Sequence, residues 1–244
     1  MMDSNTARRL LDLNRQFYQT FGREFAATRQ RLQPGVRRIL ESLGGDESIL
    51  DLGCGNGGLA QALARRGHRG AYTGLDLSLP LLEAAAPPPE GFPARFLQRD
   101  LASPDWERDL APASFDLVTC FAMLHHLPGA ALRLALVRKV RTLLRPGGRF
   151  IHSEWQFLGS ERLKKRIQPW SAAGLAPSDV DAGDALLDWR QGGRGLRYVH
   201  AFDPSELQAL AAAGGFRIVA SFLSDGEGGK LGLYQVWAAP PGPA

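Results

Sequence analysis

Hydrophobic residues along this chain follow two alternating patterns, one typical of helices and one typical of short buried strands. Residues 5–42 show the first pattern, because their apolar side chains recur three and four residues apart. These side chains are Leu10, Leu13, Phe17, Phe21 and Phe25. Pro34 and Gly35 interrupt the stretch, so two helices are expected there.

Seven short apolar runs predict strands, and further helical stretches lie between most of them. The predicted strands are 48–52, 71–75, 94–98, 115–121, 149–154, 216–223 and 231–238. The further helices are 58–66, closed by Gly67, then 80–86, 130–144 and 203–213, with Asp203 as the N-cap of the last. Strands alternating with helices form parallel βαβ units. The sequence therefore predicts an α/β fold: a doubly wound, Rossmann-like, seven-stranded sheet with an antiparallel C-terminal hairpin strand.

Length and spacing fit a single domain with one insertion. The chain has 244 residues, 44% of them hydrophobic, which is enough for a core without disulfides or metals. Residues 1–45 are expected to form an N-terminal helical cap, and 46–155 with 203–239 the core. Residues 156–202 are polar, rich in glycine and too long for an ordinary connection, so they predict a substrate-side insertion.

Composition excludes several classes of protein. The chain has no run of 18 apolar residues and no apolar segment typical of a signal peptide, so we expect no membrane span and a cytoplasmic location. Two cysteines, Cys54 and Cys120, are too few for a disulfide framework or a structural zinc site, and no metal is expected. Residues 8–38 hold eight arginines against two acids, which fits either contact with a phosphate backbone or a solvated helix.

A glycine-rich stretch, Asp51–Gly58, directly follows the first predicted strand and opens a predicted helix. Glycines allow a sharp turn and let a ligand lie against the main chain, while N–H groups at the start of the helix suit a carboxylate. Gly53, Gly55 and Gly58 also fit the G-x-G-x-x-G pattern of dinucleotide enzymes, so this stretch alone leaves two cofactor classes open.

Three acidic residues favour a positively charged cofactor over a diphosphate. Asp51, Asp76 and Asp100 stand at the carboxyl ends of three successive predicted strands. Asp51 suits a ligand ammonium, Asp76 suits ribose hydroxyls and Asp100 suits an adenine amino group. Asp76 and Asp100 also fit the simpler role of turn or cap residues.

These residues resemble the motifs of class I S-adenosylmethionine-dependent methyltransferases. Residues 51–57 are similar to the first motif, Asp76 to the second and Asp100-Leu101 to the third, while 115–118 and 144–148 resemble the fourth strand and the loop before the fifth. The resemblance implies S-adenosyl-L-methionine as cofactor and a set of residues that bind it. This set is Asp51, Gly53, Cys54, Gly55, Asn56, Asp76, Leu77, Asp100, Leu101 and Phe121.

The remaining segments resemble one subfamily, the tRNA methyltransferases that esterify 5-carboxymethyluridine at the wobble position. Residues 25–29 followed by Pro34 are similar to its N-terminal segment, and His125-His126 and Trp155 also fit. Residues 197–202 match its Arg-Tyr-Tyr-His-x-Phe run except at Val199, and Gln30 and Gln33 stand where the subfamily has aromatic residues. The resemblance implies tRNA as a partner and raises the possibility of a small activator subunit, as in eukaryotic relatives.

The chemistry of that reaction fits the residues present. A carboxymethyl group has a pKa near 4 and is already a nucleophile at neutral pH, so the reaction needs placement more than a general base. Arg29 and Arg197 are the candidate clamps for the carboxylate, with Tyr198, His200 and Trp155 shaping the pocket or stacking on a base. Arg29 also fits a solvated helix, and Arg197 and His200 also fit a role in anchoring the helix that follows them. His125-His126 has no assigned role.

Two rival functions stay open. A small-molecule O-methyltransferase acting on a carboxylate or phenolic metabolite fits the moderate net charge of +4. A non-catalytic protein with the same fold is less consistent with the sequence, because the glycines and acids expected to bind S-adenosylmethionine are all present.

Overall fold

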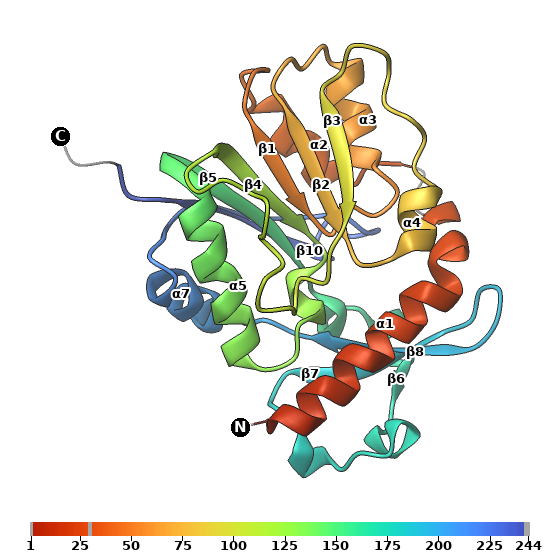
Figure 1. Cartoon of the computed structure of the whole chain (residues 1–244). Coiled ribbons are helices and arrows are strands. Elements are labelled where there is room, and N and C mark those ends of the chain that lie inside the picture. The colour runs from red at the N-terminus through yellow and green to blue at the C-terminus, as the bar shows by residue number, and fades with distance from the viewer. Residues whose placement is uncertain (1, 29–30, 242–244) are drawn as a thin grey trace.

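The computed structural model describes residues 2–28 and 31–241, and its centre is a seven-stranded sheet in the order β3-β2-β1-β4-β5-β10-β9 (Figure 1). The strands are β1 (Ile49–Leu52), β2 (Tyr72–Asp76), β3 (Ala94–Gln98), β4 (Phe115–Phe121), β5 (Leu144–Trp155), β9 (Arg217–Ser224) and β10 (Gly232–Ala238). The first five strands pair in parallel, and β10 runs antiparallel to both β5 and β9. The predicted fold class is confirmed.

Six of the helices lie where the apolar spacing predicts them, with ends shifted by a few residues. The helices are α1 (Ser4–Ala27), α2 (Pro34–Glu41), α3 (Gly58–Arg65), α4 (Leu79–Glu83), α5 (Ala130–Leu143), α6 (Glu161–Lys164) and α7 (Pro204–Ala213). Pro34 begins α2, since a proline in the first turn lacks only an N–H that would have no partner in the helix. The Asp203 side chain accepts a hydrogen bond from the Glu206 N–H at 2.8 Å and caps α7 as expected.

Helices cover the sheet on both faces. Leu50 and Leu52 of β1 belong to the apolar cluster formed with α5 and α7, whereas Ile49 belongs to the cluster formed with α2 and α3. Alternate residues of a strand point to opposite faces, so a strand buried on both sides is apolar almost throughout. Because helices cover both faces of the sheet, a ligand site is expected at the carboxyl ends of the parallel strands.

Residues 156–202 contain a second, smaller sheet that the apolar pattern did not predict. Its antiparallel strands lie in the order β6 (Ile167–Gln168), β7 (Asp184–Trp189), β8 (Gly195–His200). In Figure 1, α1 runs diagonally across β8, and many residues of the two elements are close to each other. The insertion and the N-terminal helix thus form one wall beside the main sheet.

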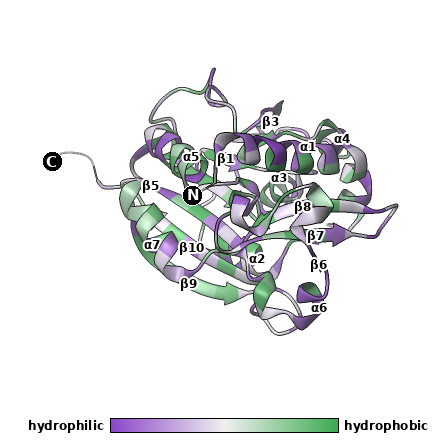
Figure 2. Ribbon diagram, turned by 90° about the horizontal axis from the view of Figure 1, so that it is seen from below, coloured by the Kyte–Doolittle hydropathy of each residue, from purple (hydrophilic) through white to green (hydrophobic). Residues whose placement is uncertain are grey.

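Helix α1 is amphipathic, as expected for a helix that packs on the protein with one face and meets solvent with the other. Figure 2 shows hydrophobic and hydrophilic residues alternating along α1, whose buried positions include Leu10 and Phe17. Within the part of the chain that the structure describes, no helix combines the length and the apolar character needed to cross a membrane.

Candidate active site

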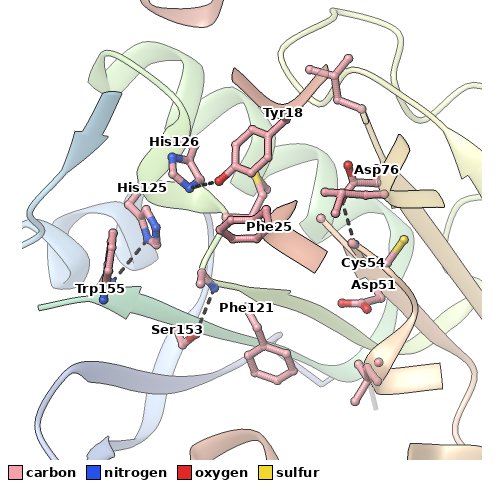
Figure 3. A pocket seen from close by; sticks show the side chains of 18 of the residues that line it. Tyr18, Phe25, Asp51, Cys54, Asp76, Phe121, His125, His126, Ser153 and Trp155 are labelled. Carbon is pink, nitrogen blue, oxygen red and sulfur yellow. Dashed lines mark hydrogen bonds between the residues drawn. The ribbon is translucent and has the colours of Figure 1, made fainter. Parts of the chain in front are cut away.

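A cavity of about 320 Å³ opens at the carboxyl ends of β1, β2, β3, β4 and β5, and side chains of α1 line it as well. Figure 3 shows part of its lining. All ten residues that the sequence assigned to the cofactor line it: Asp51, Gly53, Cys54, Gly55, Asn56, Asp76, Leu77, Asp100, Leu101 and Phe121. They come from four strand ends that are far apart in sequence. The parallel sheet brings these ends together at one edge, as the topology requires.

The glycines of the loop at residues 53–58 have different structural roles. Gly53, Gly55 and Gly57 have φ angles of +75°, +56° and +72°, which side chains rarely allow. A Cβ added to Gly53 would lie 2.6 Å from the Met123 side chain, so this glycine is needed for packing. A Cβ added to Gly55 would meet no atom within 4 Å, because it would point into open space. Gly55 therefore keeps clear a part of the cavity that a ligand can occupy.

Asp51 and Asp76 are buried carboxylates on the cavity wall. Asp51 accepts hydrogen bonds from the Tyr72 hydroxyl at 2.6 Å and the Thr119 hydroxyl at 2.7 Å. Burial raises the pKa of Asp51 to about 6, and these two hydrogen bonds offset only part of that effect. Asp76 accepts from the Gly55 N–H at 2.9 Å, and burial raises its pKa as well.

Asp100 faces the cavity from the end of β3, and α1 supplies it with a partner. The Arg15 guanidinium donates to one Asp100 oxygen at 2.8 Å, and the Ala102 N–H donates to the other at 3.0 Å. Asp76 makes a similar turn contact, accepting from the Ser78 N–H at 2.8 Å. Both acids therefore combine the turn role and the cavity position that the sequence left as alternatives.

Arg197 of β8 reaches the cavity from the smaller sheet and is only 4% exposed. Four aromatic rings lie 5.0–5.6 Å from its guanidinium carbon: Phe17, Phe25, Trp155 and Trp189. Its Nε is buried without a hydrogen-bond partner. Across the described ranges 2–28 and 31–241, no carboxylate forms an ion pair with this guanidinium. Among the described residues, the Arg197 guanidinium thus contacts aromatic rings and no carboxylate.

The other predicted catalytic residues have different positions. Trp155 lines the cavity, but Tyr198 and His200 do not. The Tyr198 hydroxyl donates to Asp184, and the His200 imidazole lies between Asp184 and Glu206. The contact with Glu206 in the first turn of α7 fits the anchoring role that the sequence also allowed for His200. Arg29 lies outside the described residues.

Tyr18, His125 and His126 also line the cavity (Figure 3). No role was assigned to the two histidines from the sequence, and nothing in the sequence singled out Tyr18. His126 Nδ1 lies 3.0 Å from the Tyr198 carbonyl oxygen, which only accepts, so this nitrogen carries the proton. The other nitrogen, Nε2, then accepts from the Tyr18 hydroxyl at 2.9 Å. No motif marks Tyr18, because it reaches the site only through the packing of α1.

A buried carboxylate lies behind these histidines. Glu154 is 1% exposed and lies between His125, at 3.1 Å, and His152, at 2.9 Å. Burial raises the pKa of Glu154 and lowers that of His152 to about 3. His152 is therefore neutral at physiological pH. Among the residues that the structure describes, no three His, Cys, Asp or Glu side chains form a group able to hold a metal ion.

Comparison with known sequences identifies relatives that match most of the chain and others that match about half of it. A family described as a methyltransferase domain matches residues 23–221. A protein of Encephalitozoon cuniculi named as a methyltransferase is 31% identical over 205 residues, which cover 83% of this chain and 86% of that protein. A ubiquinone biosynthesis O-methyltransferase of Serratia proteamaculans is 35% identical over 119 residues, or 47% of this chain and 46% of that one. The chain thus spans about half the length of the Serratia enzyme.

Solved structures share the fold. A Burkholderia thailandensis 1,6-didemethyltoxoflavin-N1-methyltransferase, solved with bound 1,6-didemethyltoxoflavin and S-adenosylhomocysteine, has a TM-score of 0.63 and 21% identity; the match covers 98% of this chain and 92% of that one. A Haloferax volcanii methyltransferase in complex with the activator Trm112 has a TM-score of 0.68 and 15% identity over 94% of this chain and 99% of that one. Because the family match extends over most of its length, this chain belongs to the class I S-adenosylmethionine-dependent methyltransferases and uses S-adenosylmethionine as its cofactor.

Proposed function

We propose that this enzyme methylates a carboxylate held by Arg197, and that the acceptor is 5-carboxymethyluridine at the wobble position of tRNA. The observation that carries the proposal is the buried Arg197 guanidinium, which lines the cavity without a counter-ion among the described residues. A buried charge is costly unless it is paired. An anionic ligand would complete the pair, and a carboxylate matches the planar fork of N–H donors that arginine presents.

The ten cavity residues named above are proposed to hold the cofactor, which supplies an electrophilic methyl group when it is bound. Asp51 is suited to its ammonium, Asp76 to the ribose and Asp100 to the adenine. The acceptor carboxylate is ionised at neutral pH, so Arg197 has only to orient it. With the cofactor bound, its methyl carbon would be transferred from sulfur, which would keep the electron pair of the broken bond, to the carboxylate oxygen that Arg197 holds. Such orientation is worth roughly 7–11 kcal/mol in favourable cases.

Several features support a nucleic-acid acceptor. The rings around Arg197 provide flat apolar faces on which a base can stack. Exposed arginines include Arg31, which lines the cavity, and Arg194 in the β7–β8 hairpin. The Haloferax structure of similar fold contains an activator subunit, and we propose a small activator as a partner of this chain too.

A phenolic metabolite is the second candidate acceptor, and the His125–Glu154 pair favours it. His125 Nδ1 lies 3.1 Å from a Glu154 oxygen and 3.4 Å from the Trp155 N–H. In the tautomer whose Nδ1–H donates to Glu154, Nε2 is the proton acceptor of the ring. A phenol has to lose its proton to attack a methyl group, so it needs such a base. The partial match to an O-methyltransferase of ubiquinone biosynthesis points the same way.

Methyl transfer to three acceptors separates these functions. The purified enzyme, with and without an activator subunit, is incubated with labelled S-adenosylmethionine and either tRNA containing 5-carboxymethyluridine, the free nucleoside, or a catechol. We expect label in the tRNA as a base-labile ester, and a tRNA affinity that falls steeply with salt. Label in the catechol alone would reject the carboxylate proposal and leave the phenolic candidate.

Asp51 is expected to make cofactor binding depend on pH. A cofactor ammonium pairs with the ionised carboxylate, whose pKa is about 6 in the ligand-free protein. Below that pH the Kd of S-adenosylhomocysteine should rise, by about tenfold per pH unit at most, and above it the Kd should level off. Calorimetric titration at a series of pH values checks this, with Asp51→Asn as the variant that should flatten the profile. A wild-type Kd that does not change with pH would contradict the assignment of Asp51 to the cofactor ammonium.

The effect of Asp51 on the stability of the ligand-free protein has the opposite sign. Because folding raises its pKa from the ordinary value of 3.8, the folded state gains protons between that value and about 6. Its contribution to stability is therefore full below pH 3.8 and is lost as the pH rises through about 6. The same carboxylate thus binds the ligand best under the conditions in which it stabilises the free protein least.

A further inference from the structure

A cluster of five polar side chains joins the smaller sheet to the main domain, on the opposite side of β8 from Arg197. The His200 cluster consists of Arg133, Asp184, Tyr198, His200 and Glu206. Arg133, Asp184 and His200 are almost fully buried as side chains, and Glu206 is partly exposed. These residues come from α5, β7, β8 and α7, so the cluster spans the boundary between the insertion and the core.

Both nitrogens of the His200 ring face carboxylates. Nδ1 lies 2.7 Å from an Asp184 oxygen, and Nε2 lies 2.8 Å from a Glu206 oxygen. Carboxylate oxygens accept hydrogen bonds, so both ring nitrogens must carry protons for both bonds to form, which makes the ring an imidazolium. Arg133 donates to the other Glu206 oxygen at 3.2 Å. The cations are then His200 and Arg133, and the anions are Asp184 and Glu206. The cluster therefore carries no net charge.

The cluster connects directly to the cavity through β8. Arg197 and Tyr198 are consecutive, and their side chains point to opposite faces of the strand. The Tyr198 hydroxyl donates to Asp184 within the cluster, while its carbonyl oxygen accepts from His126 on the cavity wall. Asn14 of α1 bonds to both the N–H and the carbonyl of Tyr198. A shift of β8 would therefore move Arg197 and the contact with His126 together.

We propose that His200 is a positioning residue: as an imidazolium bridging Asp184 of the insertion and Glu206 of the core, it holds β8 so that Arg197 faces the acceptor. The role of Arg197 rests on the proposed function, whereas the bridge itself does not. Arg133 also donates to the Leu127 carbonyl, beside the histidine pair, so the core side of the bridge is attached to the cavity wall as well.

The bridge is expected to weaken at high pH. Burial disfavours the charged ring, as does the nearby Arg133, but the hydrogen bonds with Asp184 and Glu206 outweigh both, and the pKa of His200 is raised. Asp203, the N-cap of α7, adds a further negative charge nearby. A raised histidine pKa means that the bridge is complete below the ordinary value of 6.5 and is lost as the pH rises through the value in the folded protein.

Hydrogen exchange tests the bridge without any substrate. In the full-length protein, His200→Gln is expected to lower the protection of the β7 and β8 amides by roughly 10- to 100-fold, the size of effect expected for hydrogen bonds to charged groups. Protection in β1 and β4 should not change. In wild type, β8 protection should fall with rising pH, and in His200→Gln it should not. His68→Gln, which removes a buried histidine far from the cluster, serves as the matched control.

Acceptor kinetics test the positioning. With 5-carboxymethyluridine as the probe, His200→Gln should raise KM by roughly 10- to 100-fold, in line with the loss of protection. The Kd of S-adenosylhomocysteine should not change. Equal β8 protection in wild type and His200→Gln would overturn the proposal, and so would a raised KM without loss of protection. If the exchange results hold but no carboxylate acceptor is methylated, the proposed function fails while the bridge stands.

Discussion

Replacing Arg197 by alanine is expected to lower kcat/KM for a carboxylate acceptor by roughly 30- to 5000-fold, which corresponds to about 2–5 kcal/mol for removing one partner of a buried charge pair. Four aromatic rings surround the guanidinium. In Arg197→Ala, water is therefore a poor substitute for the N–H donors that the acceptor carboxylate loses. The Kd of S-adenosylhomocysteine should stay at the wild-type value, because the glycine loop and the three acids are not altered. Single-turnover methyl transfer and calorimetry measure the two effects separately.

Two further variants control this experiment. Arg194→Ala removes an exposed arginine three residues away on the same hairpin and should leave methyl transfer to the free nucleoside unchanged. Arg197→Met keeps apolar bulk between the rings, so its Tm shows whether lost activity reflects lost folding. Methyl transfer by Arg197→Ala at the wild-type rate would remove Arg197 from the acceptor site.

Gly55→Val is expected to abolish measurable binding of S-adenosylmethionine and S-adenosylhomocysteine. The new side chain would extend into the open part of the cavity, where no protein atom lies within 4 Å of the added Cβ. It would also strain a residue whose φ is +56°, at a cost of roughly 1–3 kcal/mol, and so disturb the hydrogen bond from the Gly55 N–H to Asp76. Calorimetric titration with each ligand is the direct measurement.

Backbone strain alone must be separated from blocking of the cavity. Gly67 is a suitable control, because its φ is +72° and an added Cβ also meets nothing within 4 Å, yet it does not line the cavity. Gly67→Val should therefore lower Tm through strain but bind S-adenosylhomocysteine normally. Normal binding by Gly55→Val would mean that the cofactor does not approach the main chain at this loop.

The cofactor half of the cavity was predictable because its signals are local in the sequence. The glycine loop needs a strand before it and a helix after it, and each acid stands at the end of one apolar run. Parallel strands bring those ends to one edge of the sheet whatever the details of packing. All ten predicted residues consequently line the cavity, including Leu77 and Phe121, which carry no chemical signal of their own.

The substrate half was only partly predictable, because it depends on contacts between distant segments. The short strands β7 and β8 pair with each other, and β7 also pairs with β6. The glycine and polar residues between β7 and β8 made this stretch read as a polar insertion. Once β8 is a strand, alternation separates Arg197 from Tyr198 and His200, although all three stand within four residues. Sequence reasoning grouped them in one pocket. The aromatic rings around Arg197 come from α1, β5 and β7, and no spacing rule joins those elements.

Local sequence determined the fold class and the kind of cofactor expected: strand and helix periodicity predicted the sheet, and a side-chain-free turn beside three carboxylates favoured a cationic cofactor. The methyltransferase family followed from the resemblance of these motifs. Tertiary structure alone decided which charges are paired. It neutralises Asp100 with Arg15 and His200 with two acids, and it leaves Arg197 among rings without a carboxylate in the described chain. The reason is physical: local conformation follows from neighbouring residues, whereas the partner of a buried charge depends on how distant segments pack.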